Sequence, residues 1–317
     1  MSVASYLEAT DLLSLALSCK RFGSKKGKAN DREYRQMKRD AKRHKVGKGN
    51  ILEWSALEEA ARCIVERGRK TFPNYEGALP LLKGESWIHR LHQLQALSKP
   101  LTFDQLVGCG AGWSMETQIF ASRDRTTAGT YRRGYYLACS NYVMRGGKHF
   151  VNFTLEGWGT FVRVGVMRPV KNCEEKGIST LSLTGSHDAL LREKNERWGD
   201  GIVNNCNYNM HDGVCKWSDW EKHPHPEIYR RNPTDPVVHT HDIFVVSWAG
   251  MEGCKKDDVA GLLLDLDEGT LTVYKNGRPL GVMKDGLNGE YCWTVDIYCS
   301  GVDDAPSVKI ERGDIPV

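Results

Sequence analysis

The most constraining feature of this sequence is the stretch from Asp257 to Leu287, where short apolar segments alternate with turn residues. In the first segment, leucine recurs at every second position from Leu262 to Leu266, which is the period of a β-strand. A glycine at the end of 267–269 permits a tight turn, and Asn276-Gly277 is a strong hairpin signal. The stretch therefore predicts three antiparallel strands joined by two short turns.

Four motifs follow one another in this stretch: Leu264-Asp265-Leu266-Asp267, the run Thr270 to Tyr274, Asn276-Gly277, and Leu280-Gly281. Two further motifs precede it, Gly147 to Leu155 and Val162 to Val166, and Glu290 to Val295 follows it. In this order they resemble the signature of the SPRY (B30.2) domain family, with Trp293 and Thr294 in place of the Pro-Ala pair usual in the last strand. The resemblance covers about residues 105 to 313. It implies a β-sandwich that binds a peptide or protein through its loops and catalyses no reaction.

The first hundred residues have helical periodicity instead. A chain of 317 residues fits about two domains of ~150 residues each. Ser55 and Glu58 form a capping box, which predicts a helix to about Gly68. Ser86 begins another helix, and Pro100 ends it.

Near Gly108 the spacing of the apolar residues changes from the period of a helix to that of a strand, and this change predicts the domain border. Thr102 and Gln105 are expected to begin one more helical turn before it. We therefore expect an α+β chain, with a helical region at 1–104 and a SPRY-like antiparallel β-sandwich at 105–317. The alternation places strands at 115–122, 134–140, 148–155, 160–167, 200–208, 243–249, 291–298 and 307–311, besides the central three, with long irregular stretches at 168–199 and 209–241.

An apolar stripe is expected near the start of the chain. Thr10-Asp11 caps a run in which Leu12, Leu13 and Leu17 share one helical face. With Phe22, this run resembles the second half of an F-box over residues 4–22. The resemblance implies that Leu12, Leu13, Leu17 and Phe22 bind a Skp1-type adaptor, and that the protein is a substrate receptor of a cullin ubiquitin ligase. The alternative is that this helix packs on the helices that follow it.

The segment 20–48 carries most of the positive charge. It holds thirteen Lys or Arg residues and three Asp or Glu residues, so its net charge is +10 while that of the whole chain is +4. The remainder of the chain is therefore acidic. We interpret the segment as a solvated linker. The alternative is a contact with nucleic acid or another polyanion, which would weaken steeply with salt.

Several motifs superficially resemble catalytic or metal sites. Gly108 to Gly112 lacks the preceding strand and following helix of a phosphate loop. The residues of Ser186-His187-Asp188 are consecutive, whereas the members of a catalytic triad converge from separate positions. Asp265 and Asp267 belong to the SPRY-like turn. The remaining candidates, His211, His223, His225, His239, His241, Cys206 and Cys215, show no recognised zinc spacing. We expect no enzyme activity, no metal and no cofactor.

The cysteines and the apolar runs bear on location. Ten cysteines without a CxxC pair indicate reduced thiols inside the cell. The run from Leu12 to Cys19 is short for a signal peptide and lacks basic residues before it. No apolar run reaches the ~20 residues of a membrane span. We expect a cytoplasmic or nuclear protein.

Aromatic and arginine residues gather in and beside the two irregular stretches, and these residue types form most interface hot spots. By analogy with the SPRY family, the ligand surface is expected where the loops before Gly147, after Val166 and after Tyr298 meet the region of Trp198. Glycines on both sides of Asp200 favour a tight turn that presents Trp198 at the rim. The alternative is that Trp198 fills the end of the sandwich. The residues that we expect to bind the partner are Arg133, Arg168, Trp198, Asp200 and Ser300.

Overall fold

The computed structural model describes residues 56–68, 85–110, 119–157, 161–176, 178, 187–220, 244–300 and 305–316. The chain divides into two units, Met1–Lys99 and Pro100–Val317. The expected border between residues 104 and 105 lies inside the first strand of the second unit. The two units are described separately.

In the first unit, two helices pack on each other: α4 (Ala56–Gly68) and α6 (Trp87–Ser98). Their buried core joins Leu57, Ala61 and Val65, at helical spacing on α4, to Leu91 and Leu94 of α6. This spacing places one residue per turn on the shared face.

Two polar contacts fix the beginning of α6. The Ser86 side chain accepts a hydrogen bond from the backbone N–H of His89 at 3.1 Å, which confirms the predicted cap. The Glu58 carboxylate of α4 accepts another from the backbone N–H of Trp87 at 2.6 Å. The second helix is therefore tied to the first at its N-terminus.

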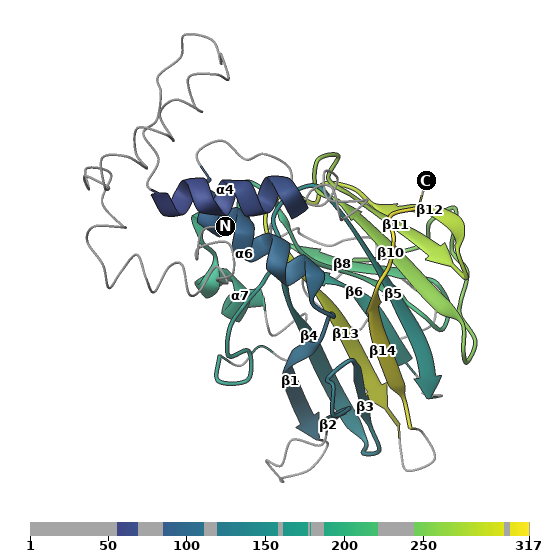
Figure 1. Cartoon of the computed structure of the whole chain (residues 1–317). Coiled ribbons are helices and arrows are strands. Elements are labelled where there is room, and N and C mark those ends of the chain that lie inside the picture. Colours follow the sequence, from purple (N-terminus) through teal and green to yellow (C-terminus); the bar gives the residue numbers. More distant parts are fainter. Residues whose placement is uncertain are drawn as a thin grey trace, which may run out of the picture. The chain divides into compact units, whose positions relative to one another are not determined.

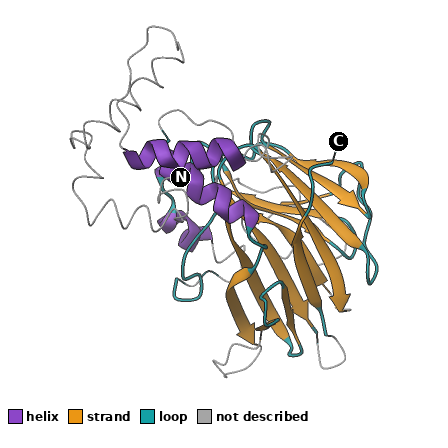
Figure 2. Cartoon of the chain, viewed as in Figure 1, coloured by secondary structure: helices purple, strands orange, loops and turns teal. Residues whose placement is uncertain are grey.

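In the second unit, fourteen strands of the described residues form two antiparallel sheets of seven strands each (Figures 1 and 2). The predicted antiparallel β-sandwich, with helices in the N-terminal region, is confirmed. Sheet A has the order β1 (Phe103–Gly110), β4 (Gly134–Met144), β13 (Tyr291–Cys299), β6 (Phe161–Met167), β7 (Val203–Asn209), β8 (Cys215–Asp219) and β9 (Phe244–Val246). Sheet B has the order β12 (Arg278–Lys284), β11 (Thr270–Lys275), β10 (Val259–Asp265), β5 (Lys148–Gly157), β14 (Ser307–Arg312), β3 (Thr127–Thr130) and β2 (Ile119–Ala121).

The stretch from Asp257 to Leu287 contains β10, β11 and β12. Leu262 of β10 pairs with Val273 of β11, and all of these strands are antiparallel to their neighbours. The β11–β12 turn has positive φ at Asn276 (50°) and Gly277 (79°), as a type I′ hairpin requires. The Asn276 side chain also accepts a hydrogen bond from the backbone N–H of Val259 at 2.9 Å. The hairpin prediction is confirmed.

The main core lies between the inner faces of the two sheets. On sheet A, Trp293 pairs with Val166, and both are buried. The ring of Phe153 on sheet B meets the Trp293 ring edge-on, with centroids 6.3 Å apart. Residues that alternate with these, such as Cys292, therefore lie on the outer face of sheet A.

Three strands differ from the sequence-based expectation. Residues 103–110 form β1 rather than a helical turn, because Phe103 and Val107 are buried and the segment pairs with β4. The stretch expected to be irregular at 209–241 contains β8, which pairs with β7. The short strand β3 was also missed. In each case, hydrogen bonding to a neighbouring strand decides the conformation. Local sequence propensity does not reveal such pairing.

We predict that the fragment Pro100–Val317 folds on its own, since both sheets lie within it. Far-ultraviolet circular dichroism should show β-structure and one cooperative melt. A matched fragment that begins at Gln105 lacks the buried Phe103 and should melt at a lower temperature. A longer fragment without a cooperative melt would contradict the prediction.

Candidate functional site

The five expected ligand residues lie at opposite ends of sheet A. β13 pairs with β4 from Tyr291 opposite Met144 to Cys299 opposite Gly134. Arg133 and Ser300 adjoin the Cys299 end, whereas Arg168 adjoins the Tyr291 end, because Met167 pairs with Cys292. The nine residues of β13 span roughly 30 Å at ~3.3 Å per residue. The expectation of one shared surface is therefore wrong. We call the two ends the aromatic end (Cys299) and the arginine end (Tyr291).

At the arginine end, the buried side chain of Arg168 donates hydrogen bonds to two loops, and we call this arrangement the Arg168 clamp. Its Nη1 donates to the backbone oxygens of Trp198 at 3.0 Å, Asn288 at 2.7 Å and Glu290 at 3.2 Å. Its Nη2 donates to Gly201 O at 2.9 Å. The guanidinium lies 4.2 Å from the centroid of the Tyr291 ring, and burial lowers the pKa of Arg168. Arg168 thus holds the chain at 198–201 to the chain at 288–290.

Trp198 lies in the interior rather than at the rim, so that expectation is wrong. Its side chain is 1% exposed and stacks on Trp220, with centroids 5.7 Å apart and planes 10° apart. It belongs to an apolar cluster with outer-face residues of sheet A such as Met167 and Cys292. The reason is the Arg168 clamp, which fixes the Trp198 carbonyl. Asp200 remains exposed.

The segment between β6 and β7 covers the outer face of sheet A at the arginine end. It contains α7 (His187–Glu193) and the 3₁₀ helix η3 (Glu196–Trp198). Its buried residues pack with outer-face residues of β1, β4, β6 and β13. We call this segment the cover; its residues in the apolar cluster are Val170, Cys173, Ile178, Leu190 and Trp198.

At the aromatic end, four rings form a row across the outer face of sheet A. Tyr135 of β4 and Tyr298 of β13 have centroids 4.5 Å apart. Phe161 of β6 lies 6.0 Å from Tyr298, and His211, just beyond β7, lies 6.1 Å from Phe161. The registers explain the row, because Tyr298 pairs with Tyr135 on one side and with Phe161 on the other. We call these four residues the aromatic row.

A second row, of polar residues, lies next to the aromatic row on the same face. Arg163 Nη1 donates to Asp296 Oδ2 at 2.8 Å. Burial raises the pKa of Asp296, while the Arg163 guanidinium acts against this rise. Among the described residues, the buried Nε of Arg163 has no acceptor. Farther along, Thr294 Oγ1 donates to Asn207 Oδ1 at 3.4 Å. Three members of this row, Thr294, Asn207 and Asp296, are buried, and the Arg163 side chain is partly exposed beside the rings.

Exposed arginines flank the aromatic row. Arg132 and Arg133 immediately precede β4, and both side chains are exposed, as is Ser300 after β13. Neither guanidinium makes an ion pair with any part of the chain that the structure describes. Tyr131, 62% exposed, stacks on Phe120 with centroids 4.8 Å apart. Aromatic rings and exposed arginines therefore meet at this end.

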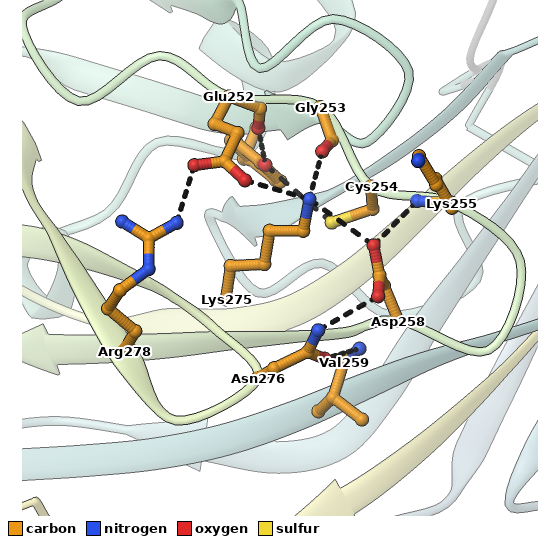
Figure 3. Close-up of polar contacts among 10 residues, drawn as sticks. Glu252, Gly253, Cys254, Lys255, Asp258, Val259, Lys275, Asn276 and Arg278 are labelled. Atoms are coloured by element: carbon orange, nitrogen blue, oxygen red, sulfur yellow. Dashed lines mark hydrogen bonds and ion pairs between the residues drawn. The ribbon is translucent and has the colours of Figure 1, made fainter.

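A polar cluster around Lys275 supports the same end of the sandwich (Figure 3). Lys275 Nζ donates to Glu252 Oε1 at 2.9 Å and to Gly253 O at 2.7 Å, and lies 3.3 Å from Asp258 Oδ2. Arg278 pairs with the other Glu252 oxygen at 2.5 Å. The segment before β10 is thereby held on the β11–β12 hairpin.

This cluster also positions His211. Cys254 N donates to Met210 O at 2.5 Å, and the Tyr208 hydroxyl donates to Glu252 O. The two backbones approach so closely that a Cβ on Gly253 would collide with His211 O. Only glycine fits this contact. The turn that carries His211 is therefore fixed by the segment that Lys275 holds.

The remaining candidate sites have structural roles or lie outside the described residues. Asp265 Oδ1 accepts hydrogen bonds from the N–H groups of Asp267 and Glu268, both at 3.1 Å. The sulfurs of Cys206 and Cys215 are 3.8 Å apart and buried. In the part of the chain that is described, no three His, Cys, Asp or Glu side chains form a metal-binding group. The candidates outside it are Leu12, Leu13, Leu17, Phe22, the segment 20–48, Ser186, His223, His225, His239 and His241.

Sequence reasoning missed the aromatic row. Tyr135, Phe161 and Tyr298 lie near strand ends and far apart in the sequence. Their only local signal is that each lies at the first or last positions of an expected strand. The cross-strand register brings them together. None of the described helices has the length and apolar character needed to cross a membrane.

Comparisons with known proteins show no family for this chain. No family model matches the chain, and no curated protein matches it. Similar solved structures include the SPRY domain of human HERC1, at 15% identity and a TM-score of 0.38, covering 62% of this chain and 94% of that one. The TRIM65 PSpry domain is 13% identical, with a TM-score of 0.33 and coverage of 72% and 98%. The carbohydrate-binding module CBM66 from Bacillus subtilis is 11% identical, with a TM-score of 0.33 and coverage of 66% and 96%. Since these similarities are low, the fold assignment rests on the sheet order and registers.

We predict that Trp198→Ala lowers the free energy of unfolding by about 3–5 kcal/mol, because it opens a cavity under the cover. Chemical denaturation of the full chain measures this loss. Ile202→Ala is the control, since Ile202 is 42% exposed nearby, and it should cost less than about 1 kcal/mol. Equal effects of the two changes would show that Trp198 does not anchor the cover.

We also predict a pH-dependent effect of Lys275→Met on the Tm. The hydrogen bond to Glu252 raises the pKa of Lys275, and that bond lowers the pKa of Glu252; Asn276 and other donors lower the pKa of Asp258. Because the pKa values of Glu252 and Asp258 are lowered, the stabilisation of the fold by this cluster is present above the ordinary carboxyl range. It is lost as the pH falls through the lowered values. The raised Lys275 pKa means that it is also lost as the pH rises through that value.

The measurement compares the Tm of the wild type and of Lys275→Met between pH 2 and pH 11. The difference should be largest near neutrality, on the order of 3 °C for each kcal/mol lost, and should shrink below about pH 4. Lys309→Met is the control, because Lys309 makes an exposed ion pair with Glu311 at 3.4 Å. A difference that stays constant across the whole range would contradict the assignment.

Proposed function

We propose that the sandwich is a protein-interaction module that binds a peptide segment of a partner across the aromatic end of sheet A. The observation that carries this proposal is the aromatic row, with Arg132 and Arg133 exposed at its β4 side. Tyr, Trp and Arg dominate interface hot spots, because they bury a large area and bond in a fixed geometry. The resemblance of residues 105–313 to the SPRY family supports the same function.

The polar row favours an extended peptide as the ligand. A peptide that lies along a surface must satisfy its own N–H and C=O groups. The Arg163 side chain is partly exposed beside the rings, whereas its Nε and the Asp296 carboxylate are buried. The rings of the aromatic row supply apolar contact area beside these polar groups. A segment with alternating side chains therefore finds both kinds of contact.

We predict that Tyr298→Ala and Arg133→Glu each weaken partner binding by about tenfold or more, because each removes one component of the surface. Quantitative affinity capture with the full chain, compared between wild type and variants, measures the loss. Arg197→Glu is the matched control, since Arg197 is exposed at the arginine end. The Tm of each variant must stay near that of the wild type.

Two outcomes would contradict this function. In the first, Arg197→Glu abolishes capture and the two changes at the aromatic end do not, which would place the site at the arginine end. In the second, neither end matters, which would show that the partners bind outside the sandwich.

We further propose that the protein is a substrate receptor of a Skp1-cullin ubiquitin ligase, on the basis of the F-box-like motif at residues 4–22. Leu13→Asp with Leu17→Asp should abolish binding of a Skp1-type adaptor and leave the Tm of the sandwich unchanged. Pull-down with purified adaptor tests this. If the wild-type chain binds no adaptor, the ligase role is wrong, and the interaction module remains.

A further inference from the structure

We infer that the segment bound at the aromatic end is an acidic peptide of four to five residues, with its carboxylates beside Arg132 and Arg133 and apolar side chains over the aromatic row. The inference rests on the proposed function and specifies the ligand of that site.

Two neighbouring arginines at this end are exposed and have no carboxylate partner among the described residues. Arg163 is balanced by Asp296, and Lys275 and Arg278 are balanced by Glu252 and Asp258. Arg132 and Arg133 have no such partner in the described part of the chain. Among the described residues beside the aromatic row, exposed arginines without an ion pair therefore lie at its β4 side.

The dimensions of the row set the length of the segment. It crosses from β4 over β13 and β6 to the turn after β7. Three strand spacings of ~4.8 Å give about 14 Å. An extended peptide covers ~3.3 Å per residue, so four to five residues span the row. Because the arginines are at one edge, the acidic residues must be at one end of that segment.

The chemistry favours a carboxylate over the alternatives. A guanidinium binds a carboxylate through two parallel N–H···O bonds, and Arg is over-represented where such groups are recognised. Two neighbouring arginines repel a basic segment. The rings of Tyr135, Tyr298 and Phe161 require apolar partners to bury their faces, which a purely acidic chain does not provide. An acidic end followed by apolar residues satisfies both requirements.

The test is selection from a phage-displayed library of random twelve-residue peptides on the full chain. The wild type should enrich peptides with Asp or Glu at one end of a short motif that also contains apolar residues. The double variant Arg132→Glu/Arg133→Glu should select motifs in which Lys or Arg replaces the acid. Synthetic versions of the wild-type peptides should bind the double variant at least tenfold more weakly by fluorescence anisotropy, and Arg197→Glu by less than about twofold.

The basic segment 20–48 provides the main competing explanation, because it also attracts acidic peptides. Peptides whose affinity is unchanged in Arg132→Glu/Arg133→Glu bind elsewhere, and that result overturns the inference. Selected peptides without acidic enrichment that still depend on Tyr298 overturn it too, but leave the proposed function intact. If no selected peptide depends on Tyr298, the proposed function itself is wrong.

Discussion

Sheet A has two faces, and sheet B buries only one of them. The outer face must therefore be covered by other parts of the chain or carry polar side chains. Both solutions occur on the same strands. At the arginine end, the cover buries Met167 and Cys292 under Trp198. At the aromatic end, the same strands carry Arg163, Asp296 and the aromatic row. The position where the cover ends thus separates the buried apolar part of the outer face from the part that carries the aromatic row.

The cover depends on one buried cation. Arg168 follows β6 directly and binds four backbone oxygens, three of them through one nitrogen. Removing a guanidinium from water is costly, and these charge-assisted bonds offset the cost. Because the oxygens belong to residues 198–201 and 288–290, the bonds close two loops at once. This explains why Trp198, which was expected at the rim, lies in the interior.

The fold was more predictable than the site, for a physical reason. Strands such as β10 and β11 are visible in the sequence because alternation and turn residues are local properties. The orientation of Trp198 depends on Arg168, thirty residues earlier, and on Glu290, ninety-two residues later. The aromatic row likewise needs the registers of β4, β13 and β6. Arg133 and Ser300 were expected beside Arg168 and Trp198, whereas the registers place them at the aromatic end.

The aromatic row is built on rigid elements, and this bears on how tightly it can bind. Tyr135, Tyr298 and Phe161 lie on paired strands, and His211 lies on a turn packed against the segment that Lys275 holds. A surface whose side chains are already ordered loses less conformational entropy on binding than a loop does. A short peptide has few contacts to offset that loss. A row carried on strands therefore suits the proposed ligand of four to five residues better than the long irregular segments do, although the length of those segments had made them the more obvious candidates.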